Sequence, residues 1–164
     1  MSSQGRISSL FNINLGTHAE VSGRDNIVIR GLIKGWSNRK IKELLPNIIE
    51  FSELGDFIDL PLRTYSDGMR MRLLFAIATA FSPEILLLDE WIGAGDAKFQ
   101  RKAAKRMQGL VKDSGITVLA SHNRKLVLDV CDFGIWLHEG KIRASGEITQ
   151  VYNEMDQYLK TLPA

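Results

Sequence analysis

The run Ile85–Asp89, in which four apolar residues lead into Asp89 and then Glu90, most constrains how this chain can fold. A strand with one wet face alternates apolar and polar residues, and this run does not. It is typical of a strand buried on both faces, as in a parallel sheet covered by helices. A second apolar run, residues 116–121, has the same character. With 164 residues, the chain is long enough for one domain with a hydrophobic core.

Helical patterns alternate with these strands in the second half of the chain. The predicted helices cover residues 68–81, ended by Ser82 and Pro83, then 97–112, Arg124–Val130 and 147–159. Between the last two, Phe133–His138 and residues 141–145 flank Glu139-Gly140 and predict a hairpin. This order predicts an α/β fold whose mostly parallel sheet is covered on both faces, with the hairpin as an antiparallel edge.

The first half is expected to be helical from residue 25 to about residue 60, after a short strand plus loop within residues 7–15. Gly35 breaks the pattern, and Ser37 or Asn38 can cap the next helix. Pro46 interrupts the helical spacing that follows. Gly55 and Pro61 then predict loops.

Composition narrows the functional classes. A net charge of +2 gives no general argument for a nucleic acid or an anionic membrane as partner. The single cysteine, Cys131, cannot form an internal disulfide and fits a reducing cytoplasm. No run approaches the ~20 apolar residues of a membrane span, so we expect any membrane association to be peripheral. A basic stripe is interpreted as a solvated helix face rather than a nucleic-acid groove: Lys98, Arg101, Lys102 and Lys105.

Two adjacent acids follow the first strand. Asp89 stands at the carboxyl end of that strand, where open α/β sheets bind ligands. One Asp is enough for a Mg²⁺ ion that is also bound by phosphates. Glu90 points to the other side and is placed to orient or deprotonate a water that attacks a γ-phosphate. The alternative is a strand that ends in two solvated acids.

A polar turn, Tyr65-Ser66-Asp67-Gly68-Met69, opens the helix before that strand. Ser66 is a good N-cap, and Gly68 would let a phosphate approach the first backbone N–H groups. Because a helix N-terminus carries free N–H groups and the positive end of the dipole, it can bind an anion. An ordinary N-cap is the alternative. Asp67 would have to point away from such a phosphate.

Taken together, the turn, its helix and the strand with its two acids resemble the ATP-binding subunit of ABC transporters. The turn stands where that family has its L-S-G-G-Q signature; the serine and second glycine match, and Tyr65, Asp67 and Met69 replace the other three residues. A Tyr-Ser-x-Gly-Met turn followed by Arg resembles the subfamily that exports polysaccharides such as O-antigen, capsule or teichoic acid. The resemblance extends from about residue 5 to residue 159.

The resemblance also implies roles for single residues. Asp89 would hold Mg²⁺, Glu90 would be the catalytic carboxylate, and His122 would be the switch histidine that contacts the γ-phosphate. Residues 93–96 would be the D-loop, the connector that crosses the dimer interface, although Asp96 can equally be the N-cap of the next helix. The turn would bind ATP held by another subunit: Tyr65, Ser66, Asp67, Gly68 and Met69. No Q-loop residue is assigned, although Asn12 or Asn14 stands near that position.

For the whole chain, the resemblance implies a partial P-loop NTPase core of the ABC type. We expect one nucleotide-binding domain over residues 1–164 that contains a helical subdomain at residues 22–62. The implied cofactors are ATP and Mg²⁺. The implied partners are a second ATP-binding subunit, head to tail, and membrane permease subunits, with no nucleic acid. The expected location is the inner face of the plasma membrane.

One motif of that family is absent from the sequence: no G-x-x-x-x-G-K-S/T phosphate loop (Walker A) occurs. We therefore expect a fragment truncated at its start or a degenerate paralogue, inactive by itself. Two alternatives stay open. One is a non-catalytic subunit that donates its signature helix to an intact partner, and the other is a DNA-associated ATPase of the same fold.

Overall fold

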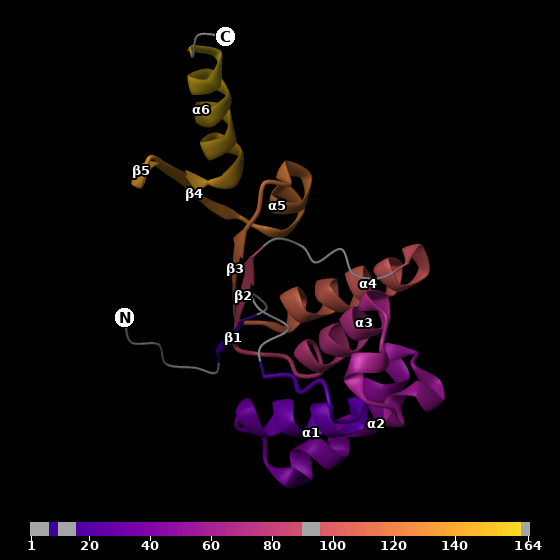
Figure 1. Cartoon of the computed structure of the whole chain (residues 1–164). Helices are drawn as coiled ribbons and strands as arrows, with labels where there is room; N and C mark the ends of the chain where they lie inside the picture. The colour runs from indigo at the N-terminus through magenta and orange to yellow at the C-terminus, as the bar shows by residue number, and fades with distance from the viewer. Residues whose placement is uncertain (1–6, 10–15, 90–95, 162–164) are drawn as a thin grey trace. The chain divides into compact units, whose positions relative to one another are not determined.

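The computed structural model describes residues 7–9, 16–89 and 96–161, which fall into two compact units, Met1–Val118 and Leu119–Ala164 (Figure 1). The first unit holds β1 (Ile7–Ser9), α1 (Gly23–Ile33), α2 (Asn38–Ser52), the 3₁₀ helices η1 (Gly55–Asp59) and η2 (Leu62–Thr64), α3 (Asp67–Ala78), β2 (Ile85–Asp89) and α4 (Ala97–Asp113). Strand β3 (Ile116–Ala120) leads into the second unit. There follow α5 (Arg124–Val130), β4 (Phe133–His138), β5 (Lys141–Glu147) and α6 (Ile148–Thr161).

The parallel sheet has the strand order β1-β2-β3, and β1 pairs parallel to β2 with Ile7 opposite Ile85. Leu86 and Leu88 of β2 are buried, as the apolar run predicts. The fold class is thus confirmed as mixed α/β with a parallel sheet. No helix within the described residues combines the length and the apolar character needed to cross a bilayer.

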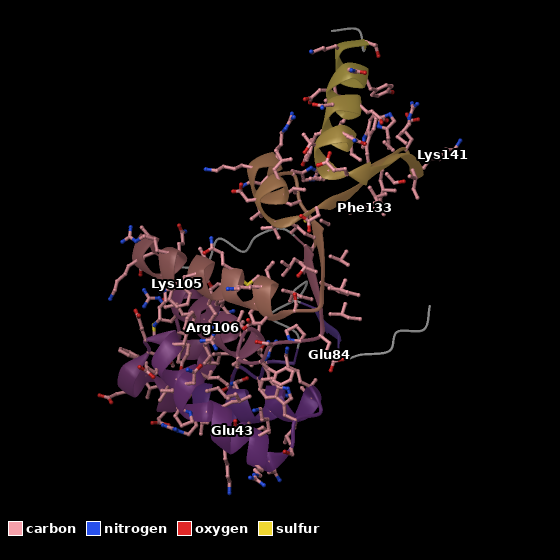
Figure 2. All side chains as sticks on the ribbon, turned by 180° about the vertical axis from the view of Figure 1, so that it is seen from behind. Glu43, Glu84, Lys105, Arg106, Phe133 and Lys141 are labelled. Carbon is pink, nitrogen blue, oxygen red and sulfur yellow. The ribbon has the colours of Figure 1, made fainter. Side chains whose placement is uncertain are left out.

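Three phenylalanines join the helices of the first unit. Phe51 of α2, Phe75 of α3 and Phe99 of α4 lie with ring centroids 5.6 to 6.1 Å apart. Phe51 and Phe75 are stacked and the other two pairs are edge-on, and aromatic contacts of these kinds add about 0.5–1.5 kcal/mol per pair beyond burial. Arg106 of α4 (labelled in Figure 2) donates to the carbonyl of Thr79, which caps the end of α3, and to the side chain of Asn47 within α2, so it links α4 to both helices.

The two ends of the segment predicted as a helical subdomain meet. Ser22 and Pro61 form an isolated antiparallel bridge, and the Leu62 N–H donates to the Val21 carbonyl at 3.0 Å. Between these ends lie α1, α2 and η1. Ser22 caps α1 and Ser37 caps α2. Of the two residues predicted as possible caps of α2, Ser37 and Asn38, the cap is therefore Ser37. This closure supports residues 22–62 as a subdomain, an assignment that stays a prediction.

Three expectations about local structure are wrong. Strand β3 is not buried, because Ile116 and Val118 are 57% and 53% exposed; an apolar run cannot specify which element covers it. The hairpin is not an edge of the parallel sheet, because β4 and β5 form a sheet of their own. Helix α2 continues through Pro46, since buried Ile41 and Ile48 on either side hold it in place.

Candidate functional site

The turn that opens α3 presents its polar residues to solvent. The Ser66 Oγ accepts from the Met69 N–H at 3.2 Å and caps the helix. The Asp67 side chain is almost fully exposed and lies 3.7 Å from Arg70 on its own helix. That guanidinium offsets part of the negative charge of Asp67, so the turn can still receive an anion.

Gly68 has no internal reason to be glycine in the described structure. A Cβ built on it would come near only the Ser66 Oγ, at 3.9 Å, and its backbone φ is not positive. Glycine inside a helix costs about 0.5–1 kcal/mol relative to alanine. The open space outside the first turn is what close approach of a ligand would require.

Tyr65 has a different position from the rest of the turn. Its side chain is 5% exposed, and its hydroxyl donates to the Phe57 carbonyl of η1 at 2.6 Å. Burial raises the pKa of this phenol. A Cβ on Gly23 would come within 2.3 Å of the same hydroxyl, so the two residues are closely fitted. The Tyr65 side chain therefore serves the fold, and only its backbone can face a ligand.

Removing that hydroxyl tests this structural role. Tyr65→Phe should lower the free energy of unfolding by about 0.5–1.5 kcal/mol, because the part-buried bond from Tyr65 to the Phe57 carbonyl is lost while that carbonyl keeps the Leu60 N–H at 3.0 Å. Urea denaturation followed by circular dichroism would measure the loss. Tyr152→Phe is the matched control, because Tyr152 lies half-buried on α6. An equal loss of stability in that variant would contradict the structural role of the Tyr65 hydroxyl.

Asp89 ends β2 with an exposed side chain. Its position after two buried leucines places a carboxylate at the carboxyl end of the strand, as predicted. Glu90 and residues 93–95 of the predicted D-loop lie outside the described residues. In the part of the chain that is described, no group of three or more potential metal ligands occurs. A single carboxylate fits a Mg²⁺ ion whose other ligands are phosphate oxygens and water.

Asp96 is the N-cap of α4, accepting from the Lys98 and Phe99 N–H groups at 2.9 and 3.0 Å. The cap interpretation is confirmed, and the D-loop role stays a prediction. The bond from Phe99 is the largest cause that lowers the pKa of this carboxyl, and the charge of Arg72 adds to it. Arg72 of α3 also forms an ion pair with Asp96. Helices α3 and α4 are thereby joined by opposite charges.

His122 lies exposed between β3 and α5, in the second unit. The Asn123 N–H donates to the Ser121 Oγ at 3.1 Å, and the Asn123 side chain caps α5 through the Leu126 N–H. The structure thus brings Ser66–Met69, Arg72 and Asp96 onto neighbouring elements of the first unit. The loop that carries His122 belongs to the second unit.

Comparisons with known proteins decide the family. No family model matches the chain. The O-antigen export system ATP-binding protein RfbE of Yersinia enterocolitica is 48% identical over 85% of this chain and 58% of that protein. RfbB of Myxococcus xanthus, of the same description, is 42% identical over 92% of this chain and 35% of that protein. The chain belongs to the ABC ATPase family. The teichoic acids export ATP-binding protein TagH of Bacillus anthracis is 36% identical over 93% of this chain and 28% of that protein.

Solved structures agree with this family. An ATP-binding subunit of an ABC transporter superposes with a TM-score of 0.69 at 19% identity, over 92% of this ABC ATPase chain and 62% of that one. The ATP-binding cassette MJ0796, a dimer with ADP and Pi, gives 0.61 at 21% identity, over 87% and 63% of the two chains. At these identities the likeness shows the fold. The chain spans between about a quarter and three fifths of the three curated relatives described above.

A charged cluster in this ABC ATPase chain was missed by sequence reasoning. Glu53 ends α2 in a left-handed conformation, φ 55°, and its carboxylate lies 2.7 Å from Lys102, 3.9 Å from Arg72 and 4.0 Å from Lys98. Lys102 also donates to the Phe51 carbonyl. Two lysines of the basic stripe are therefore engaged within the chain. The left-handed conformation of Glu53 marks it as a special residue, but a backbone angle cannot be read from a sequence, so no sequence signal pointed to this cluster.

The Glu53 cluster predicts a pH dependence of stability. The hydrogen bond from Lys102 is the largest cause that lowers the Glu53 pKa below its ordinary 4.5. A lowered carboxyl pKa stabilises the fold above the unfolded value, and this stabilisation is lost as pH falls through the folded value. Urea midpoints should therefore drop from pH 6 to below pH 4.5 more steeply in the native chain than in Glu53→Gln. Exposed Glu50 on the same helix gives the control Glu50→Gln, whose slope should match the native one.

Proposed function

We propose that this chain forms three portions of an ATP-hydrolysing subunit in a polysaccharide exporter: the signature turn, the strand that ends in Asp89 and Glu90, and the loop of the switch histidine His122. The observation that carries the proposal is Gly68, a helix-opening glycine with open space outside it and no internal reason to be glycine. Relatives described as ATP-binding proteins of O-antigen and teichoic acid export support the substrate class. Permease partners and a location at the inner face of the plasma membrane are part of the proposal.

The proposed chemistry divides between two subunits placed head to tail. Backbone N–H groups at the start of α3 receive the γ-phosphate of ATP held by the opposite subunit. Glu90 takes a proton from water as the water oxygen attacks the γ-phosphorus and the bond to the ADP oxygen breaks. His122 contacts the γ-phosphate and orients it. Asp89 would hold Mg²⁺, which supplies charge neutralisation for the phosphates when bound.

The absent phosphate loop leads to a prediction for the chain by itself. Loop N–H groups and a lysine normally neutralise much of the triphosphate charge, and without them the two acids repel ATP. The 164-residue chain should therefore bind Mg-ATP no more tightly than roughly millimolar, about −4 kcal/mol. Isothermal titration calorimetry measures this affinity. Micromolar binding would contradict the proposed division of the site.

Export is tested in cells. A chimera that places a phosphate-loop segment from an ABC ATPase ahead of this chain would be expressed in Yersinia enterocolitica lacking RfbE. Surface O-antigen should return with the chimera and fail to return with its Asp89→Asn variant. If the chimera hydrolyses ATP in vitro but restores no surface polysaccharide, the proposed ATP hydrolysis would stand and the proposed role in export would be wrong.

A second candidate is a subunit that donates its signature helix and hydrolyses nothing at its own acids. The sequence observation that favours it is the missing phosphate loop. Mixing the unmodified chain with a partner ATPase whose own signature is inactivated separates the two candidates. Hydrolysis that survives Glu90→Gln in this chain but not Gly68→Asp would establish the donor role.

A further inference from the structure

The loop that carries His122 has little support from its own helix. Helix α5 is seven residues long, and Val127 is its one buried residue. Leu128 is 40% exposed. A helix this short is not stable by itself in water, so its start must be held by contacts with another element.

Arg124, two residues after His122, makes that contact. Its Nη1 lies 3.0 and 2.7 Å from the two carboxylate oxygens of Asp156 on α6. Its guanidinium carbon lies 4.7 Å from the ring centroid of Tyr152, one helical turn earlier on α6. An ion pair together with a cation–π contact fixes the guanidinium in two directions, which neither contact achieves separately.

Helix α6 is in turn anchored independently of Arg124. Ile148 and Val151 are buried, and a Cβ on Gly134 of β4 would come within 2.5 Å of Ile148. The Tyr158 hydroxyl lies 3.2 Å from the His138 Nε2 of β4. Since these contacts hold α6 on the hairpin (Figure 1), α6 can serve as the fixed support for the start of α5.

We propose that Arg124 is a positioning residue, through which α6 fixes the loop that presents His122. Its importance for ATP hydrolysis rests on the role proposed above for His122. A displacement of α6 would reach His122 through three consecutive residues, because Arg124 begins α5 and Asn123 caps it.

The test reads the histidine rings of the whole chain by NMR, without nucleotide. The chain has three histidines, so His18 and His138 are internal references. In Arg124→Ala, the His122 ring resonances should move towards those of an unstructured peptide, and the Leu126 amide should exchange about tenfold faster. The His138 resonances should stay in place, since α6 keeps its contacts with β4.

Arg143→Ala is the matched control. Arg143 also lies over a tyrosine of α6, with its guanidinium carbon 4.7 Å from the Tyr158 ring centroid. This variant should move His138 and leave His122 unchanged. The exchanged pair Arg124→Asp with Asp156→Arg should return His122 towards its native resonance.

Two results would overturn the proposal. One is an unchanged His122 in Arg124→Ala. The other is a joint shift of His122 and His138, which would mean that Arg124 only keeps α6 folded on its unit. Because no nucleotide is used, an inactive ATPase chimera would count against the proposed function and leave this measurement unaffected.

Discussion

Replacing Glu90 by glutamine is expected to lower ATP hydrolysis about 10²–10⁴-fold in a chimera that supplies a phosphate loop ahead of this chain. Glutamine keeps the shape and hydrogen bonding of the side chain but cannot accept the proton of the attacking water. ATP binding should persist, so ATP-bound dimers should accumulate. Steady-state phosphate release and size-exclusion chromatography with ATP would measure the two effects.

The control for this variant is Glu84→Gln, which neutralises an acid just before the other end of the same strand (Figure 2). It should hydrolyse ATP at the rate of the parent chimera. Equal turnover in Glu90→Gln and the parent would move the catalytic base to another residue.

Gly68→Asp should abolish cooperation between subunits while leaving the fold intact. The new Cβ meets only the Ser66 Oγ at 3.9 Å, so the free energy of unfolding should change by less than about 1 kcal/mol. The added carboxylate would stand where the γ-phosphate of the opposite subunit must approach. Hydrolysis by the chimera should fall at least about 100-fold, and ATP-driven dimerisation should disappear.

Gly109→Asp is the matched control, because Gly109 also lies in a helix and a Cβ built on it would have nothing within 4 Å. It should leave hydrolysis unchanged. Mixing Gly68→Asp with Glu90→Gln adds a second arm: one composite site then combines an intact signature with an intact Glu90, and the other carries both lesions. Partial recovery in the mixture supports the head-to-tail arrangement, whereas no defect in Gly68→Asp would leave an ordinary helix cap.

Local signals predicted the elements that carry the candidate site. The apolar run before Asp89 predicted β2, and Ser66 predicted the start of α3, because strand burial and helix capping are written into a few adjacent residues. Arg72 and Glu53 were missed because their role depends on contacts among α2, α3 and α4, which are far apart in the sequence but adjacent in the structure. Tyr65 was assigned to the ligand side, and its burial against η1 became visible only in the structure.

The exposure of β3 could not be predicted for a related reason. Ile116 and Val118 have the side chains of a buried strand, and pattern analysis cannot tell whether a covering layer is present. The hairpin pattern correctly predicted β4 and β5 but not which sheet they join, because pairing partners beyond the hairpin leave no local signal.

The bridge between Ser22 and Pro61 has a consequence for how such chains can vary. Since the segment leaves and returns at one point, it is attached like an insertion, and its length can change without moving the strands and helices on either side. An exchanged segment would have to keep the contacts that join it to the rest of the unit: an apolar ring at the place of Phe51 against Phe75 and Phe99, an acceptor for Arg106 at the place of Asn47, and the carbonyl that accepts from Tyr65. A graft that keeps these contacts would change the outer surface of the unit and leave the strands and helices on either side of the bridge in place.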